Sequence, residues 1–202
     1  TPFALGKDKG GSFDEVEPEY ILSRLNEIGC KNVVISGGNP LVQPRETFEK
    51  LLILLLENHY WIQVETQGSV QPPLATANLV NFWSISPKLP SAGEMESGNW
   101  KAVPFFLKFP GKTQLKFVVS NQDDYQFLKS KLTDVGSFNV RCPIVLQPEG
   151  MQLSGGFNYN MYATRLKMVH ERVAEDWAFW KYYTVRVLPQ LHKIIWGNRR
   201  GV

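Results

Sequence analysis

Small and polar residues follow nearly every apolar run of this chain that could form a strand, and their types suit ligand binding. The first run is followed by Ser36-Gly37-Gly38-Asn39, and later runs are followed by Glu65-Thr66-Gln67-Gly68, Ser86-Pro87-Lys88, Ser120-Asn121, Gln147-Pro148-Glu149-Gly150 and Pro189-Gln190-Leu191-His192. Hydroxyl, amide and charged groups of this kind can hold a ligand that carries amino, carboxylate and hydroxyl groups. Turn chemistry alone explains any single one of these groups. Their repetition after successive strands favours a binding site.

The adjacent glycines Gly37 and Gly38 indicate a close approach between the backbone and a ligand. Glycine lets a ligand sit against the main chain and permits unusual dihedral angles. The stretch is neither a dinucleotide fingerprint nor a mononucleotide phosphate loop. Glu65 could accept hydrogen bonds from hydroxyls or an amine, and Lys88 could hold a carboxylate. For each of these two side chains, an exposed salt bridge is the alternative.

Strands that alternate with helices must position these residues. We expect strands at 31–36, 61–65, 82–86, 114–119, 140–146 and 183–188, helices at 15–29, 44–59, 123–132 and 162–177, and a weak helical turn at 74–80. Residues 90–109 are rich in Gly, Pro and Ser, which predicts a long loop or a variable insertion.

This alternation predicts an α/β fold with a parallel sheet, either open or closed into a barrel, in a single domain over residues 1–202. The continuous apolar runs indicate strands that are buried on both faces. In parallel α/β folds, ligands bind at the C-terminal edge of the sheet, where the polar residues that follow the strands would meet.

Composition excludes several classes of function. A net charge of +3 is too mild to argue for nucleic acid, and the apolar run Leu51–Leu56 is far too short to span a membrane. Cys30 and Cys142 lie far apart, make no zinc or cluster spacing, and are predicted to be buried reduced thiols. The three histidines also lack metal-ligand spacing. Low cysteine usage fits a cytoplasmic protein.

Six stretches occur in order over almost the whole chain: SGGNPLVQ at 36–43, VETQGS at 64–69, SISPKLPSAG at 84–93, LKFVV at 115–119, LQPEG at 146–150 and PQLHKIIWGNRRGV at 189–202. With this combination the sequence resembles the radical S-adenosylmethionine (SAM) enzymes. Within that superfamily it resembles the 7-carboxy-7-deazaguanine synthase family of queuosine and deazapurine biosynthesis.

The resemblance implies a partial, modified TIM-type barrel with parallel strands. It implies a 4Fe–4S cluster, SAM and a 5′-deoxyadenosyl radical that abstracts hydrogen from 6-carboxy-5,6,7,8-tetrahydropterin. The pterin ring would then contract with loss of ammonia. A magnesium ion, a homodimer and an electron donor such as flavodoxin are further implications.

The resemblance also assigns site residues. SAM-binding positions would be Gly37, Gly38, Asn39, Glu65, Ser86, Pro87, Lys88, Gln147, Pro148, Glu149 and Gly150. Substrate contacts would be Ser36, His192 and the C-terminal Val202, and the Thr1 hydroxyl would bind magnesium. Asn39 stands where the family's common motif has a glutamate. Its amide can still accept a hydrogen bond from an ammonium group but carries no charge.

The sequence departs from the superfamily at its start, because it contains no C-x3-C-x2-C motif for the cluster. The opening residues look like those that follow the third cysteine in the family. We therefore expect an N-terminally truncated chain that lacks the first strand and the cluster loop, and that is inactive as given.

Three alternatives stay open at this point. The first is another radical SAM enzyme, such as a glycyl-radical activase, and the second is a non-catalytic SAM-binding relative without the cluster. The third is an unrelated α/β barrel hydrolase or isomerase. That third class is disfavoured because the sequence contains no G-x-S-x-G motif.

Overall fold

Six parallel strands form one sheet in a computed structural model that describes residues 14–93, 100–136, 139–150 and 157–197. The strands follow one another across the sheet in chain order: β1 (Asn32–Ile35), β2 (Trp61–Thr66), β3 (Phe82–Ile85), β4 (Thr113–Val119), β5 (Ile144–Pro148) and β6 (Val185–Val187). Consecutive order is typical of a βα barrel and differs from the order of a doubly wound sheet. The C-terminal ends of all six strands therefore lie at one edge.

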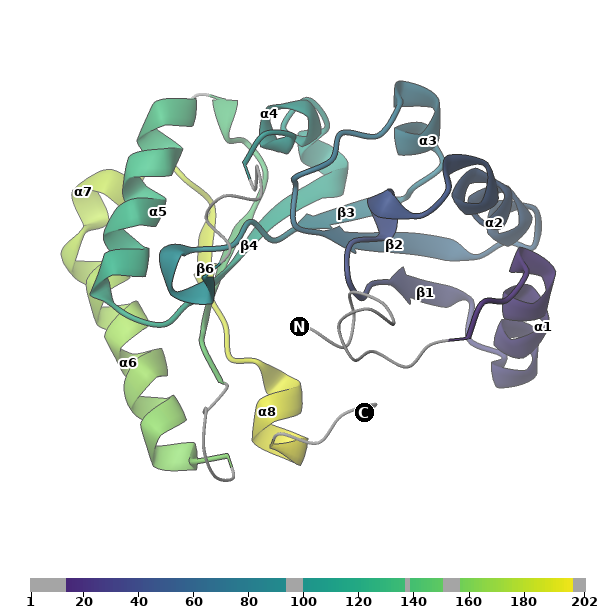
Figure 1. The fold of residues 1–202 in the computed structure, drawn as a ribbon. Coiled ribbons are helices and arrows are strands. Elements are labelled where there is room, and N and C mark those ends of the chain that lie inside the picture. Colours follow the sequence, from purple (N-terminus) through teal and green to yellow (C-terminus); the bar gives the residue numbers. More distant parts are fainter. Residues whose placement is uncertain (1–13, 94–99, 137–138, 151–156, 198–202) are drawn as a thin grey trace.

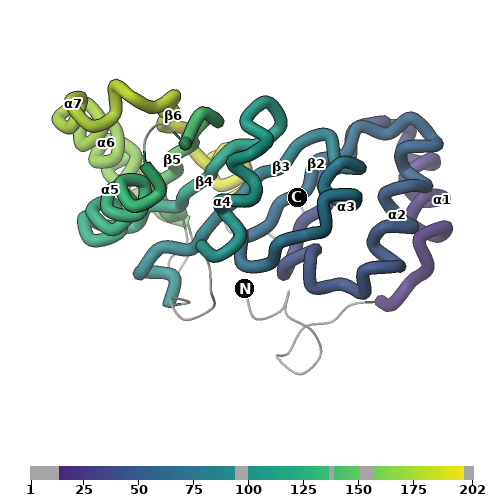
Figure 2. Tube along the Cα trace, turned by 90° about the horizontal axis from the view of Figure 1, so that it is seen from above, coloured from purple at the N-terminus to yellow at the C-terminus, as the bar shows by residue number. Residues whose placement is uncertain are grey.

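Helices connect the strands. They are α1 (Pro18–Ile28), α2 (Arg45–Glu57), α3 (Leu74–Asn78), α4 (Val103–Phe106), α5 (Gln122–Val135), α6 (Tyr159–Glu175), α7 (Trp177–Trp180) and α8 (Leu191–Trp196), with short 3-10 turns at η3 (Pro40–Val42), η4 (Pro90–Ala92) and η5 (Pro110–Lys112). In Figures 1 and 2, α1, α2 and α3 lie beside the β1–β3 end of the sheet, and α5, α6 and α7 lie beside the β4–β6 end. Helix α8 lies in the space between these two groups, below the strands in Figure 1.

Local sequence signals set the ends of the longer helices. Helix α1 begins with Pro18 at its first turn and ends at Gly29, which adopts a left-handed conformation with φ 77°. The side chain of Asn121 accepts a hydrogen bond from the backbone N–H of Asp124 at the start of α5. Asn158 caps α6 in the same way.

The two faces of the sheet differ in polarity. Along β2, β3 and β4 the residues that pack under the helices are fully buried and apolar: Ile62, Val64, Trp83, Ile85, Leu115 and Phe117. The residues between them point to the other side, which we call the inner face, and include Glu65, Ser84, Gln114 and Lys116. The expectation of burial on both faces holds on the inner face for Ser84 and Val145, which are 0% and 6% exposed, but not for the partly exposed Glu65, Gln114 and Lys116. The long helices cover only the outer face.

Two stretches between the strands also differ from expectation. Residues 90–109 were expected to be a loop, but they include α4, whose Val103, Phe105 and Phe106 are buried in the core. The hydroxyl of Thr113 donates a hydrogen bond to the carbonyl of Phe106, at 3.1 Å, and ties α4 to β4. The fifth strand begins at Ile144 rather than at 140 and extends to Pro148.

Helix α8 was not predicted from the sequence. The burial of one of the two cysteines also differs from the prediction. Cys142 is buried as expected, whereas Cys30 is exposed in the turn before β1. In the ranges that the structure describes, none of the helices is both long and apolar enough to cross a bilayer.

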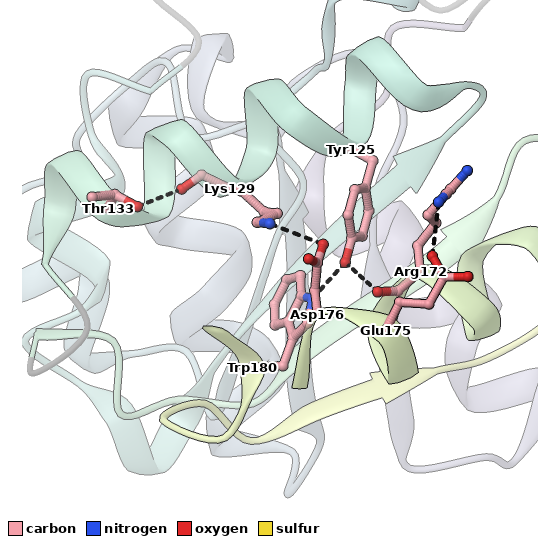
Figure 3. A network of polar contacts seen from close by, with 7 residues as sticks. All are labelled: Tyr125, Lys129, Thr133, Arg172, Glu175, Asp176 and Trp180. Carbon is pink, nitrogen blue, oxygen red and sulfur yellow. Dashed lines mark hydrogen bonds and ion pairs between the residues drawn. The ribbon is translucent and has the colours of Figure 1, made fainter. Parts of the chain in front are cut away.

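A polar network fastens α5 to α6 and α7 on the outer side of the sheet (Figure 3). The indole N–H of Trp180 donates to the hydroxyl of Tyr125 at 2.7 Å, and that hydroxyl donates to the carbonyl of Arg172 at 2.8 Å. Burial raises the pKa of Tyr125, so its hydroxyl stays protonated and can donate. Beside it, Lys129 Nζ lies 2.9 Å from Asp176 Oδ2, and this contact lowers the pKa of Asp176.

Candidate functional site

The turn after β1 presents its backbone to open space. Ser36, Gly37 and Gly38 are exposed, with φ 92° at Gly37 and 48° at Gly38. A Cβ atom built on Gly37 would meet no other atom within 4 Å. Glycine is therefore required at Gly37 by its backbone conformation, and not by crowding within the chain. The open side of the turn leaves room for a ligand against the main chain.

Asn39 joins this turn to the loop that follows β2. Its side chain is 7% exposed, and its Oδ1 accepts hydrogen bonds from Thr66 Oγ1 at 2.8 Å and from the N–H of Leu41 at 3.3 Å. Its Nδ2 donates to Ser69 Oγ at 3.1 Å. Asn39 thus holds the glycine turn in place through bonds within the chain, and direct contact with SAM stays a prediction.

Glu65 lies on the inner face and pairs with a lysine that the sequence analysis did not select. Lys116 Nζ lies 2.9 Å from Glu65 Oε1, and the two side chains are 22% and 32% exposed. The pair spans β3, because Glu65 is on β2 and Lys116 is on β4. Nearby, Gln114 Nε2 donates to Ser84 Oγ at 3.0 Å. Gln114 and Lys116 alternate with apolar residues along β4. From this alternation the sequence could have predicted that both side chains lie on one face of the sheet.

The loop that contains Ser86, Pro87 and Lys88 is anchored on both sides. The N–H of Ser86 donates to the carbonyl of Thr66 at 2.7 Å. Further along, the fully buried carboxylate of Asp124 accepts hydrogen bonds from Ser91 N at 2.9 Å and from Ser120 N at 2.8 Å. The carboxylate of Asp124 therefore links the loops after β3 and β4. Asp124 is a second residue that the sequence analysis missed.

The segment Gln147–Gly150 contacts both α6 and the start of α8. Arg165 pairs with the carboxylate of Glu149 and donates to its carbonyl at 2.9 Å. Gln147 Nε2 donates to the carbonyl of Pro189 at 3.4 Å. A Cβ atom on Gly150 would lie 2.8 Å from Gln190 Oε1. Unlike Gly37, Gly150 has no positive φ and is instead closely approached by the side chains of Gln190 and Lys193.

His192 lies in the first turn of α8, and Lys116 is within electrostatic range of it. Partial burial lowers the pKa of His192 from 6.5, and repulsion from Lys193 and Lys116 lowers it further. The imidazole is therefore neutral at neutral pH. Lys116, which pairs with Glu65, is therefore within electrostatic range of the imidazole of His192.

The residues present suit SAM better than they suit the cluster. The open glycine turn and the polar edge around it fit the ammonium and carboxylate of a methionine group. In contrast, Cys30 and Cys142 precede β1 and β5 and so lie at the opposite edge of the sheet. Among residues 14–93, 100–136, 139–150 and 157–197, no group of three or more His, Cys, Asp or Glu could hold a metal ion. Thr1 and Val202 lie outside these ranges.

Comparisons with known proteins agree on one group of relatives. The chain is 32% identical over 193 residues to a 7-carboxy-7-deazaguanine synthase from Bacillus cereus, which covers 93% of this chain and 77% of the relative. It is 31% identical to that of Bacillus subtilis, over 91% of this chain and 75% of the relative. The synthase of Pyrobaculum aerophilum is 30% identical, over 84% and 67%. No family model matches the chain.

Two solved structures share the fold. The Streptococcus suis protein SuiB, bound to the precursor peptide SuiA, matches with a TM-score of 0.61 and 15% identity, over 93% of this chain and 44% of SuiB. A radical SAM methyltransferase from Sphaerobacter thermophilus matches with a TM-score of 0.51 and 15% identity, over 89% of this chain and 59% of that protein. The chain thus spans about half the length of these two proteins. Together with the consecutive parallel strands, these matches confirm the predicted partial TIM-type barrel.

Proposed function

This chain belongs to the 7-carboxy-7-deazaguanine synthase family, and we propose that it carries the SAM and pterin sites for converting 6-carboxy-5,6,7,8-tetrahydropterin to 7-carboxy-7-deazaguanine with loss of ammonia. The family consists of radical SAM lyases. The observation that supports the proposal is the polar inner face, which opens toward an edge with an exposed glycine turn. A purely structural parallel sheet would bury apolar residues on both faces.

In this proposal the methionine end of SAM binds at the C-terminal edge. The backbone of Gly37 and Gly38 faces the ligand, and Asn39 keeps that turn fixed against β2. Lys88 and the segment Gln147–Gly150 stand at the same edge, where they can contact the carboxylate and the amino group. When bound, SAM would supply the 5′-deoxyadenosyl group, which becomes a hydrogen-abstracting radical, with methionine as the other product, once one electron from a 4Fe–4S cluster cleaves SAM.

The pterin would lie on the inner face below SAM. Glu65 can accept hydrogen bonds from its amine and N–H groups, and neutral His192 can either donate or accept. Ser36 lies at the end of β1, between the glycine turn and the sheet. These side chains would hold and orient the ring.

Several parts of the proposal rest on the family alone. They are the 4Fe–4S cluster, the magnesium ion with Thr1 as ligand, the substrate contact of Val202, the homodimer, an electron donor such as flavodoxin, and a cytoplasmic location. The two cysteines of this chain do not fit the cluster, so we derive no step through it. A second candidate function, which the open glycine turn supports equally, is that of a SAM-binding relative without catalysis.

Calorimetric titration with SAM tests the proposal. Replacing Gly37 (φ 92°) with alanine should strain the turn by about 1 kcal/mol and place a methyl group where the ligand lies. Replacing Gly29 with alanine is the matched control, because Gly29 has φ 77°, open space around it, and a place at the opposite edge. We expect Gly37→Ala, and not Gly29→Ala, to weaken SAM binding by about 10-fold or more.

Equal SAM affinity in both variants would refute the proposed position of SAM. The codons upstream of Thr1 are sequenced first, and turnover of 6-carboxytetrahydropterin by the protein from the full reading frame, after anaerobic reconstitution with iron and sulfide, then separates the two candidate functions. Product formation supports the synthase, and SAM binding without product supports the non-catalytic relative.

A further inference from the structure

The inner face carries a second cation, Arg186, which the proposed function does not use. The strand register pairs Lys116 of β4 with Val145 of β5, and Val145 with Arg186 of β6. Residues that are paired across parallel strands point to the same face. Lys116, Val145 and Arg186 therefore form one row across three strands, level with one another.

Burial agrees with this placement. Ile144 and Leu146 belong to the core under the helices, whereas Val145 is buried without joining that core. Val185 and Val187 pack against the core, and Arg186 between them is exposed. Val145 is thus the apolar floor of the row, with a long cationic side chain on either side.

The two cations differ in what they contact. Lys116 is paired with Glu65. Arg186, in contrast, has no hydrogen bond or ion pair with any other residue that the structure describes. A charged residue on an edge strand can serve to prevent pairing with other strands. That role would not require Arg186 to stand level with Lys116 and on the same face.

We propose that Lys116 and Arg186 form a carboxylate subsite on the inner face, and that it holds the 6-carboxylate of a pterin substrate. The proposal rests on the proposed function. Neighbouring strands lie about 4.8 Å apart, so the backbones of the two cations are about 10 Å apart, and their side chains can meet over Val145. The arginine fork binds a carboxylate through two hydrogen bonds, and Lys116 adds a point charge.

The charges on the inner face explain why the carboxylate would point toward β6. Glu65 lies on the β2 side of Lys116 and would repel a carboxylate, but it attracts the N–H groups of a pterin ring. The acid group is therefore directed toward β6 and the ring toward β2. The subsite would separate carboxylated pterins from uncharged ones, which makes Arg186 a residue that determines specificity.

The test compares two ligands rather than two activities. The full chain, with SAM present, is titrated with pterin-6-carboxylate and with unsubstituted pterin, and binding is followed by pterin fluorescence. We expect the wild type to prefer the carboxylated ligand by about 10- to 100-fold, the range for a hydrogen-bonded charge. Arg186→Met should remove most of this preference and leave the affinity for pterin unchanged. Arg186→Lys should retain part of it.

Lys129→Met serves as the control, because it removes a lysine in a similar ion pair outside the inner face. It should leave the preference intact. The proposal is overturned if Arg186→Met keeps the wild-type preference, or if it weakens both ligands equally. If the wild type binds neither pterin, the proposed substrate itself is wrong, and the subsite fails with it.

Discussion

Two ion pairs in this molecule have nearly the same geometry and very different surroundings. Lys116–Glu65 and Lys129–Asp176 are both 2.9 Å long, with side-chain exposures of 22% and 32% in the first pair and 21% and 32% in the second. The second pair belongs to the network in Figure 3, and Lys129 also lies 5.2 Å from the centre of the Phe179 ring. The first pair lies across an open sheet face.

The comparison teaches that distance and exposure do not by themselves reveal what an ion pair does. Around Lys129 and Asp176, the hydroxyl of Tyr125 and the indole of Trp180 already bond to groups within the chain. Arg186 stands on the same face as Lys116 and has no partner among the described residues, and the imidazole of His192 is within electrostatic range of Lys116. The surroundings of Lys129 and Asp176 stabilise the fold, and those of Lys116 and Glu65 are suited to a ligand.

The largest expected effect comes from Glu65→Gln, which keeps the shape of the side chain and removes its charge. Pterin affinity should fall by about 10- to 100-fold, because a charged acceptor for the ring N–H groups is lost. The midpoint of thermal unfolding should change little, since partly exposed ion pairs contribute about 1 kcal/mol or less. Titration and thermal unfolding of the same sample check both parts. A large loss of stability at unchanged affinity would assign this pair to the fold.

Tyr125→Phe should show the opposite behaviour. It leaves the buried indole N–H of Trp180 without its acceptor, whereas the carbonyl of Arg172 keeps the backbone N–H of Asp176 at 3.0 Å. The free energy of unfolding should fall by about 1–3 kcal/mol, with SAM and pterin affinities unchanged. Urea denaturation measures the loss. A variant as stable as the wild type would show that the network does not stabilise the fold.

A smaller effect concerns how the stability contributed by the Lys129–Asp176 pair depends on pH. Lys129 lowers the pKa of Asp176 below 3.8, so the pair contributes its full stability above that pH and loses it as the pH falls through the lower folded value. Asp176→Asn should be less stable than the wild type by about 1 kcal/mol at neutral pH. This difference should shrink in acid below the pKa. A difference that stays constant from neutral pH into acid would exclude the ionised pair as its source.

The smallest effect is a change in the pKa of His192. Lys116 is the weakest of the three causes that lower it. Lys116→Met should therefore raise the pKa slightly toward 6.5, which a proton NMR titration can detect. Lys129→Met should leave it unchanged. A shift in the control variant alone would mean that α8 does not lie near Lys116.

Much of the fold followed from local patterns, and the misses have physical reasons. Alternating strands and helices and the shared C-terminal edge were predictable, because apolar periodicity and capping residues are local signals. The short helices α4 and α8 were not, since helices of this length depend on tertiary packing. The polarity of the inner face was also missed, because the apolar run LKFVV does not show which side the helices cover.

The candidate site was predictable to a similar extent. The residues that follow the strands could be selected from the sequence, but their partners could not. Lys116 pairs with Glu65 across 51 positions, and Asp124 bonds to Ser91 across 33. Such contacts depend on strand order and register. The two glycines illustrate the same limit, because the sequence does not show that Gly37 has a positive φ in open space whereas Gly150 lies against the side chains of Gln190 and Lys193.

One measurement tests the central claim most directly: backbone amide NMR shifts of the chain with SAM, recorded as pterin-6-carboxylate is added. The inner face and the C-terminal edge should respond, with the largest changes near Glu65, Lys116 and Arg186. The network around Tyr125 and Asp176 should stay unchanged. Changes confined to the helix layer, or none at saturating ligand, would contradict the assignment of the inner face as the pterin site.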